Sequence, residues 1–411
     1  MKRGQLEWHL LILVTLGLVA FGLVMVYSAT SASAALGNGD PMSYLKRQGT
    51  YAVLGIVLLI IASRFDYRRL RLLAPGLIVA SIGLCAAVLA IGPAVNGARR
   101  WISFGPAVFQ PSELAKLALA IWLASYLARR KPPGTLKALW RPIGLLVGVF
   151  AALIILEPDL GTVIAIVVMV LAILLVSGTP MPVLFGGTTI VTALGLAAIY
   201  IEPYRRVRFF SFLNPWHDAQ GAGFQTVQAM IGLGSGGIFG VGLGRGVEKI
   251  FYLPEAHTDM IFAIIGEELG LIGVTIVIAA YAAFAWAGLR IAMQCVDPFG
   301  ARLAAGLTAL VCGQAVINLA AVLGLAPLTG IPLPFVSYGG SNLVVQLVAV
   351  GILLNIASRH AHAAKAEVPD RGRGDGRTRD AVAGGGGGAQ RPRRAGDVRR
   401  VAGAGRGSAR R

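Results

Sequence analysis

Long apolar windows dominate this sequence and limit what it can fold into. A membrane helix needs about twenty mostly apolar residues. Ten windows of this kind cover residues 8–28, 48–63, 72–92, 113–128, 142–157, 160–178, 182–201, 260–289, 302–325 and 343–358. The chain is 56% hydrophobic and 14% charged, whereas a soluble domain is about a quarter charged. The sequence therefore predicts an all-α integral membrane protein with about ten transmembrane helices.

The basic residues predict the orientation of these helices. Lys and Arg concentrate in the cytoplasmic loops of membrane proteins, and here they cluster at residues 2–3, 64–71, 129–141 and in the C-terminal tail. We therefore expect a multi-pass protein of the cytoplasmic membrane with both termini in the cytoplasm. The extracytoplasmic segments are then 29–47, 93–112, 202–259 and 326–342, and the large loop 202–259 joins the seventh and eighth helices.

The end of the chain differs from the rest in composition. Of the net charge of +18, half lies from Arg359 onward, where 14 Lys and Arg face 5 acids. This Gly/Arg-rich stretch has almost no large apolar residues and cannot bury a core. We expect a membrane domain over residues 1–360 and a disordered basic cytoplasmic tail over 361–411. Contact with anionic lipid explains such a tail better than binding to nucleic acid.

Several cations lie outside under this topology, against the usual rule. The predicted outer cations include Arg99, Arg100, Arg205, Arg208 and Lys249. Such a cluster suits an anion such as a pyrophosphate, although contact with lipid headgroups explains it equally well.

The stretch "YLPEAHTDMIFAIIGEELG", residues 252–270, places acids at the start of an apolar helix. Thr258 and Asp259 could cap that helix. Alternatively, Asp259 is a general base whose pKa is set by a partly apolar setting, with Glu255 on the same face. Glu267 and Glu268 lie deeper, where ionised groups need an interior partner or a water-filled cavity; we prefer a structural network for them.

Other polar features narrow the options further. Lys116 lies one turn into a predicted helix and needs a partner or a cavity. The Gly/Pro-broken segment 324–342 is irregular backbone at membrane depth, which survives where it is buried or lines a cavity. His257 has no second histidine at zinc-ligand spacing, and the glycines from Gly232 to Gly242 fit no nucleotide fingerprint. We therefore expect neither a structural metal site nor an organic cofactor.

Four stretches together resemble one family. They are "GARRWISFGPAVFQPSELAK" (97–116), "EPDLGT" (157–162), the segment from "NPWHDAQGAGFQ" to "GEELG" (214–270) and "GIPLPFVSYGGSN" (330–342). These motifs are similar to those of the SEDS family (shape, elongation, division and sporulation), whose members include FtsW, RodA and SpoVE. The resemblance covers residues 8–360 and is nearest to the FtsW, or cell-division, branch. It departs from the family pattern at Val108, where some members have a basic residue, and at Asn342, where Ser is common.

The resemblance implies a peptidoglycan glycosyltransferase that polymerises lipid II into β-1,4 glycan at the outer face of the bacterial cytoplasmic membrane. Its catalytic aspartate falls on Asp259. Glu255, Lys116, Arg99 and Arg100 are carried over as substrate-binding residues. The other substrate-binding candidates in or near these motifs are His257, Arg205, Arg208, Gln225 and Ser337.

The chemistry agrees with this implication. Sugar transfer from a lipid pyrophosphate needs a base for the acceptor hydroxyl and cations for the departing pyrophosphate. Asp259 would supply the first, and Lys116 with the outer arginines the second, with or without a divalent cation (Mg²⁺ or Mn²⁺). One carboxylate suffices for inversion because the leaving group is already acidic, unlike the two-carboxylate glycosidases.

The resemblance also implies partners, namely a class B penicillin-binding protein (a transpeptidase), undecaprenyl-pyrophosphate-linked glycan and other divisome proteins. Three alternatives stay open at this point. The chain could instead be a lipid II flippase or transporter, a division scaffold without activity, or an elongation polymerase of the RodA branch. A transporter needs no base at the outer interface, and a scaffold needs no cavity.

Overall fold

The computed structural model describes residues 5–35, 41–94, 97–105, 107–250 and 252–366. Of the predicted tail 361–411, residues 361–366 continue the last helix, Gly340–Ala366, and the rest lies outside the described residues, so the proposed division at residue 360 stays a prediction.

Long helices make up the fold, as the sequence predicts. They are α1 (Gln5–Ala35), α2 (Pro41–Arg64), α3 (Leu70–Ile91), α4 (Pro111–Ala128), α6 (Leu145–Leu156), α7 (Leu160–Val176), α8 (Met181–Ile201), α11 (Ile261–Gln294), α12 (Pro298–Val322) and α13 (Gly340–Ala366). Short elements link them: η1 (Tyr67–Arg69), α5 (Leu136–Leu139), η2 (Trp140–Gly144), α9 (Pro203–Leu213), η3 (Pro215–Asp218) and α10 (Phe224–Ser235). Strands β1 (Ile102–Phe104) and β2 (Ala107–Phe109) pair as an antiparallel hairpin, with Ser103 opposite Val108.

Each of the ten predicted windows falls on one of these long helices. Within the described residues, eight helical segments are long and apolar enough to cross a membrane. The other two windows fall on α7, an apolar helix of 17 residues, and on α4, a helix of 18 residues that carries Glu113 and Lys116. The all-α membrane fold is confirmed, with β1 and β2 as a small addition.

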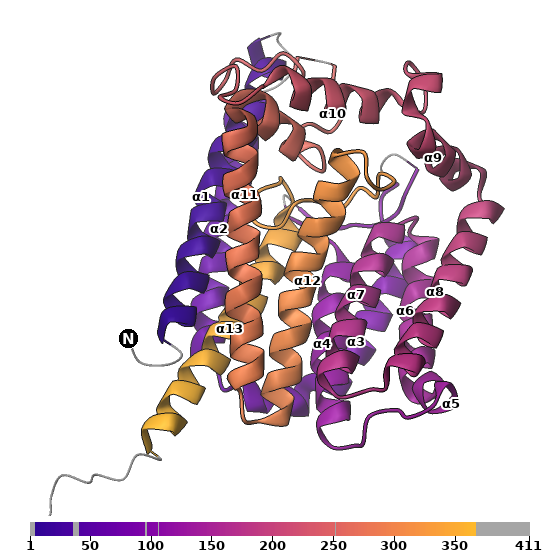
Figure 1. Cartoon of the computed structure of the whole chain (residues 1–411), viewed down its shortest axis with the longest axis vertical. Helices are drawn as coiled ribbons and strands as arrows, with labels where there is room; N and C mark the ends of the chain where they lie inside the picture. Colours follow the sequence, from indigo (N-terminus) through magenta and orange to yellow (C-terminus); the bar gives the residue numbers. More distant parts are fainter. Residues whose placement is uncertain (1–4, 36–40, 95–96, 106, 251, 367–411) are drawn as a thin grey trace, which may run out of the picture. The chain divides into compact units, whose positions relative to one another are not determined.

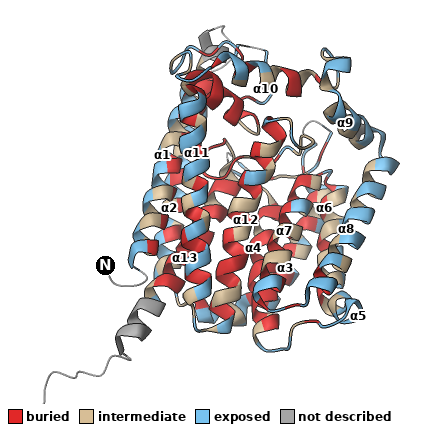
Figure 2. Cartoon of the chain, viewed as in Figure 1, coloured by how far each residue is buried: buried red, intermediate tan, exposed pale blue. Residues whose placement is uncertain are grey.

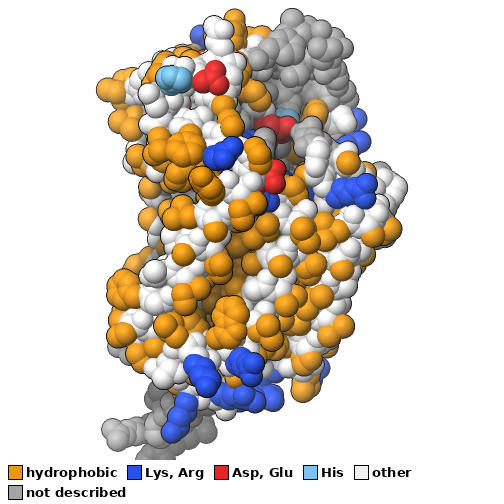
Figure 3. All heavy atoms as spheres, turned by 90° about the vertical axis from the view of Figure 1, so that its right-hand side faces the viewer, with side chains coloured by type: hydrophobic (Ala, Val, Ile, Leu, Met, Phe, Trp, Pro, Cys, Tyr) orange, Lys and Arg blue, Asp and Glu red, His pale blue; other side chains and the backbone are white. Residues whose placement is uncertain are grey.

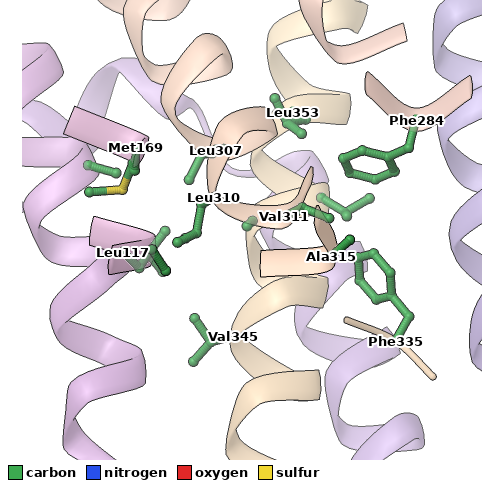
Figure 4. Close-up of a cluster of buried hydrophobic side chains, with 14 of the residues drawn as sticks. Leu117, Met169, Phe284, Leu307, Leu310, Val311, Ala315, Phe335, Val345 and Leu353 are labelled. Atoms are coloured by element: carbon green, nitrogen blue, oxygen red, sulfur yellow. The ribbon is translucent and has the colours of Figure 1, made fainter. Parts of the chain in front are cut away.

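The central helices of the bundle are the most buried (Figure 1, Figure 2). In α13, 78% of the most apolar window is buried inside the protein, against 6% in α8. α8 therefore presents nearly all of its apolar surface outward, as a helix that faces lipid does. Figure 4 shows the core between these helices, where Leu310 and Val311 of α12 lie between Leu117 and Phe335.

Close helix contacts depend on small residues, which let backbones approach. A Cβ added at Gly351 of α13 would lie 2.5 Å from the carbonyl oxygen of Leu59 in α2, and one added at Gly22 of α1 would lie 2.6 Å from that of Phe335. The first contact brings α13 against α2, and the second brings α1 against the irregular segment that follows α12.

The connecting segments gather at the two ends of the bundle. α9 and α10 lie at one end, and α5 lies at the other (Figure 1). On the lateral face in Figure 3, a broad apolar band separates basic side chains at the lower end from charged side chains in the upper part. Such a band between polar ends is the surface expected of a membrane-spanning bundle.

Candidate active site

The candidate base lies in a compact turn before α11. The backbone N–H of Thr258 donates to the carbonyl oxygen of Glu255 (3.0 Å), and its hydroxyl donates to the Glu255 carboxylate (2.9 Å). The same hydroxyl lies 3.3 Å from Oδ1 of Asp259. Glu255 adopts a positive φ of 56°, which is uncommon for a side chain of this size. The turn thus brings the carboxylates of Glu255 and Asp259 into one small region.

Asp259 has the electrostatics of a base that works near neutral pH. Burial raises its pKa to about 6, and the charge of Glu255 acts in the same direction, while Arg208 and Thr258 oppose them. The capping alternative is wrong, because the N-cap of α11 is Met260 and no side chain caps this helix end. The carboxylate of Asp259 therefore does not cap the N-terminus of α11.

Groups from distant parts of the chain hold the turn in place. Asn318 of α12 donates through Nδ2 to the carbonyl oxygens of Asp259 (2.7 Å) and Ile331 (2.8 Å). The backbone N–H of Tyr338 donates to the carbonyl oxygen of His257 (2.9 Å). The His257 ring packs against Tyr44 and Tyr338 at centroid distances of 5.0 and 5.5 Å, and burial lowers its pKa, so that the neutral ring is favoured.

Ser337 stabilises the irregular segment 324–342 in this structure. Its hydroxyl is buried and accepts the backbone N–H of Leu333 (2.8 Å). Its carbonyl oxygen accepts Nε2 of Gln48 from α2 (3.1 Å). The irregular segment 324–342 is therefore held against protein on several sides, which is how non-helical backbone persists at membrane depth.

A groove of about 260 Å³ opens between α9 and α10, next to the turn. Arg208, Ser211, Gln225 and Thr226 line it, together with Pro254 of the Asp259 segment. Gln225 donates through Nε2 to the carbonyl oxygen of Pro254 (3.2 Å). Arg208 is thus a predicted cation that lines this groove and whose positive charge lowers the pKa of the candidate base.

The predicted cations divide into different environments. Arg100 donates through Nε to the carbonyl oxygen of Glu157 (2.9 Å), and also to that of Pro158. Arg99 is exposed and reaches the carbonyl oxygen of Leu89 (3.2 Å), at the end of α3. Arg205 ties α9 to the carbonyl oxygen of Ile155 in α6 (2.9 Å).

Lys249 is not part of an anion site in this structure. It is buried and its Nζ lies 2.6 Å from the Glu268 carboxylate. The preferred structural network for Glu268 and Glu267 is thereby confirmed, since Glu267 accepts the backbone N–H groups of Val247 (2.6 Å) and Glu248 (3.2 Å).

Lys116 is completely buried and pairs with Glu113 one turn earlier (2.8 Å). Asn342 of α13 donates to the same carboxylate oxygen of Glu113 (3.2 Å) and lies 3.5 Å from Oε1 of Gln314. Thus the family departure at Asn342 lies inside the network that supports Lys116. A cation in an apolar helix requires a partner or a cavity. Here the partner lies one turn away on the same helix.

The four motif stretches meet at this end of the bundle. Gln110 donates through its backbone N–H to Ser341 (3.0 Å) and through Nε2 to Asp159 (3.3 Å). Arg100 links the first motif to "EPDLGT", and a Cβ added at Gly161 would lie 2.5 Å from Ile331. Residues that are up to 231 positions apart in the chain therefore surround one region.

Sequence reasoning missed several residues of this region. Asn318, Gln314 and Tyr338 were not singled out, although each contacts a predicted site residue or its network. The signal available was a pair of amides at i and i+4, Gln314 and Asn318, in an otherwise apolar helix. Among the residues that the structure describes, no three His, Cys, Asp or Glu side chains form a group that could hold a metal ion.

Comparison with known proteins gives a consistent result. The sequence model of the family FTSW_RODA_SPOVE, described as "Cell cycle protein", matches residues 8–362. A probable peptidoglycan glycosyltransferase FtsW of Geobacter metallireducens is 40% identical over 352 residues, which are 85% of this chain and 94% of the relative. Stage V sporulation protein E of Bacillus subtilis is 39% identical over 354 residues, 85% of this chain and 96% of the relative.

Solved structures are similar as well. One comes from work on the structural coordination of polymerization and crosslinking by a peptidoglycan synthase complex. It has a TM-score of 0.71 and 30% identity, over 85% of this chain and 97% of that one. The rod shape determining protein RodA of Thermus thermophilus has a TM-score of 0.63 and 29% identity, over 85% of this chain and 96% of that one.

Proposed function

This chain belongs to the FtsW/RodA/SpoVE family and is a peptidoglycan glycosyltransferase, and we propose that it polymerises lipid II with Asp259 as the general base. The predicted family is confirmed by the match over residues 8–362. The observation that carries the assignment to Asp259 is its setting: a half-buried carboxylate with a pKa raised to about 6, beside a groove of mixed polar and apolar lining at one end of a membrane bundle.

In the proposed reaction, Asp259 removes the proton of the acceptor sugar hydroxyl. The hydroxyl oxygen then bonds to the anomeric carbon of the donor, and the bond from that carbon to the pyrophosphate breaks with its electron pair on the leaving oxygen. Attack opposite the leaving group inverts an α-linked donor into a β-1,4 glycan. The base is matched to its task because a pKa near the working pH makes proton transfer efficient.

Arg208 is the cation that we propose for the departing pyrophosphate. It lines the groove, and its positive charge lowers the pKa of Asp259. We therefore place it where negative charge grows in the transition state. Arg99, Arg100 and Arg205 would act further out on the same face. Lys116, which is buried and paired with Glu113, would support the wall of the site.

Among the described residues, no three His, Cys, Asp or Glu side chains form a group that could hold Mg²⁺ or Mn²⁺ through protein ligands alone. We propose that any divalent cation would enter with the pyrophosphate, because Mg²⁺ usually binds through substrate phosphates and only one or two carboxylates.

The transporter alternative has less support from the geometry. A translocation path needs ionisable groups that face a water-filled cavity, whereas Glu267, Glu268 and Lys116 are buried and engaged with protein partners. Relatives named FtsW favour a role in cell division. We propose an extracytoplasmic site, cytoplasmic termini, and a class B penicillin-binding protein with other divisome proteins as partners. The similarity to a peptidoglycan synthase complex supports such a partner.

The decisive experiment is polymerisation of lipid II by the purified chain together with its co-purified transpeptidase. Asp259→Asn should abolish glycan formation without loss of expression or partner binding. Glu202→Gln, at an exposed acid between α8 and α9, is the matched control and should retain activity. Normal polymerisation by Asp259→Asn would rule out the mechanism.

The pH dependence gives an independent check. The base must be ionised, so kcat/KM should fall as the pH drops below about 6, the pKa of Asp259. Glu255→Gln removes the like charge that raises this pKa, and should move the acid limb to lower pH. An acid limb that does not move in Glu255→Gln contradicts the assigned electrostatics.

A further inference from the structure

The glycine-rich loop between α10 and the Asp259 turn packs backbone to backbone onto α11. The N–H groups of Val241 and Gly242 donate to the carbonyl oxygens of Glu267 and Glu268, both at 3.0 Å. In return, the N–H of Leu271 donates to the carbonyl oxygen of Gly237 (2.9 Å). These groups are free to bond outward because α11 is interrupted at Gly270, which has a φ of 63°.

Two carboxylates of α11 then bind the end of this loop. Glu267 accepts the N–H groups of Val247 (2.6 Å) and Glu248 (3.2 Å). Glu268 accepts Nζ of Lys249 (2.6 Å) and the hydroxyl of Ser28 in α1 (2.7 Å). The side chains of Glu267, Glu268, Lys249 and Ser28 are all buried. Because buried charges are stable only when paired and hydrogen-bonded, this arrangement strongly favours one position of the loop end.

The Asp259 turn lies between the two anchored points. The chain leaves the contact at Lys249, runs through the turn, and returns to the same contact at Glu267. The turn is therefore part of a closed loop whose base is fixed by Glu267, Glu268, Lys249 and Ser28, which we call the α11 latch. The turn itself is also held by Asn318 and Tyr338, by the Gln225 bond to Pro254, and by its buried apolar side chains Leu253, Ala256 and Met260.

We propose that the α11 latch positions Asp259 for catalysis: its residues touch no substrate, and they act by holding the turn in the place where its carboxylate can work. This inference rests on the proposed function. It gives the two acids of "GEELG" a role in the reaction that goes beyond stability, because a displacement of about 1 Å at a reacting group can cost on the order of 100-fold in rate.

The electrostatics of the turn provide a readout that distinguishes positioning from folding. The raised pKa of Asp259 depends first on burial and then on Glu255, against Arg208. A turn released from its anchor would become better solvated, and the pKa of Asp259 would fall toward its ordinary value. A variant that is only less well folded would show lower activity at every pH, and the acid limb of its pH profile would stay at the wild-type pH. Glu248, whose pKa is raised to about 7 by burial and by Glu267, also faces the latch.

The test is the pH profile of lipid II polymerisation by the full chain with its transpeptidase. For Lys249→Met and Glu268→Gln we expect kcat to fall roughly tenfold or more, KM to change little, and the acid limb to move to lower pH. The charge exchange Lys249→Glu with Glu268→Lys should restore part of the activity. Ser28→Ala keeps the ion pair and should move the limb slightly in the same direction, so it tests the inference even where the other variants fail to fold.

Arg290→Gln is the matched control. Arg290 of α11 pairs with Glu7 of α1 (3.4 Å), so this variant loosens the same two helices at the opposite end of α11. It should leave kcat and the acid limb unchanged. The inference is overturned if folded latch variants keep the wild-type limb and kcat, or if Arg290→Gln moves them equally. Polymerisation by Asp259→Asn would instead overturn the proposed function, so the two failures are distinguishable.

Discussion

Replacement of Glu157 by glutamine should remove a pH-dependent cost from the fold. Glu157 ends α6 in the "EPDLGT" motif and is completely buried. No nitrogen or oxygen donor among the described residues bonds to its carboxylate oxygens, which face only the weak S–H donor of Cys85 there. Burial raises its pKa from 4.5 to about 8, with the charge of Asp159 acting in the same direction and Arg100 opposing.

The size and sign of the effect follow from these two pKa values. Between pH 4.5 and pH 8 the folded protein binds a proton that the unfolded chain has lost, so the free energy of unfolding falls as the pH rises. At about 1.4 kcal/mol for each pH unit, ionised Glu157 costs on the order of 5 kcal/mol above pH 8 and about 3 kcal/mol at pH 7. Glu157→Gln keeps the shape and carries no charge, so it should be more stable than the wild type at pH 8 and similar to it at pH 4.5.

Thermal unfolding in detergent micelles from pH 4.5 to pH 8.5 measures this difference. Glu248 also makes the folded protein less stable as the pH rises, because its pKa is raised to about 7 in the fold. This effect is the same in both proteins. The difference between the two curves therefore isolates Glu157. Glu202→Gln, at an exposed acid, serves as the control and should follow the wild type. Parallel curves for the wild type and Glu157→Gln would refute the reasoning.

Two further substitutions test the packing of charged and glycine residues. Glu113→Gln leaves the buried Lys116 without its ion-pair partner, and should lower the free energy of unfolding by about 3–5 kcal/mol; an unchanged melting temperature would contradict this. Gly240→Ala places a Cβ 2.1 Å from the carbonyl oxygen of Glu268 at a φ of 80°, and should abolish polymerisation and lower the melting temperature. Gly234→Ala in α10 meets nothing within 4 Å and should be neutral or stabilise the helix by up to about 1 kcal/mol, so equal loss in both glycine variants would count against the backbone packing.

The helices of the bundle were predictable because hydropathy alone indicates a membrane span. The predicted windows fell on the ten long helices with shifts at the ends, such as α2, which begins at Pro41, before the window at residue 48. Boundaries of this kind depend on polar ends that hydropathy does not detect. The hairpin of β1 and β2 was not predicted, because it consists of only three residues on each side.

Partners of buried charges were predictable only where the chain itself brings them together. Glu113 lies one helical turn from Lys116, so the pair could be expected from spacing. Lys249 and Glu268 are 19 residues apart across a turn, and Ser28 joins them from the first helix. Such contacts depend on how α1, α11 and the loop pack, and no local pattern in the sequence contains that information.

The glycines from Gly232 to Gly242 illustrate the same limit and connect the fold to the site. Their spacing in the sequence fits no nucleotide-binding fingerprint, and no other prediction followed from it. In the structure, Gly236 and Gly240 allow main chain to lie against main chain where α11 is interrupted, since a Cβ at Gly236 would lie 2.0 Å from the carbonyl oxygen of Gly266. The interruption at Gly270 frees the backbone groups that the loop binds, and the loop in turn fixes both ends of the Asp259 turn. A carboxylate with a raised pKa can therefore be held at the end of an apolar helix because the neighbouring backbone, rather than solvent, determines its position.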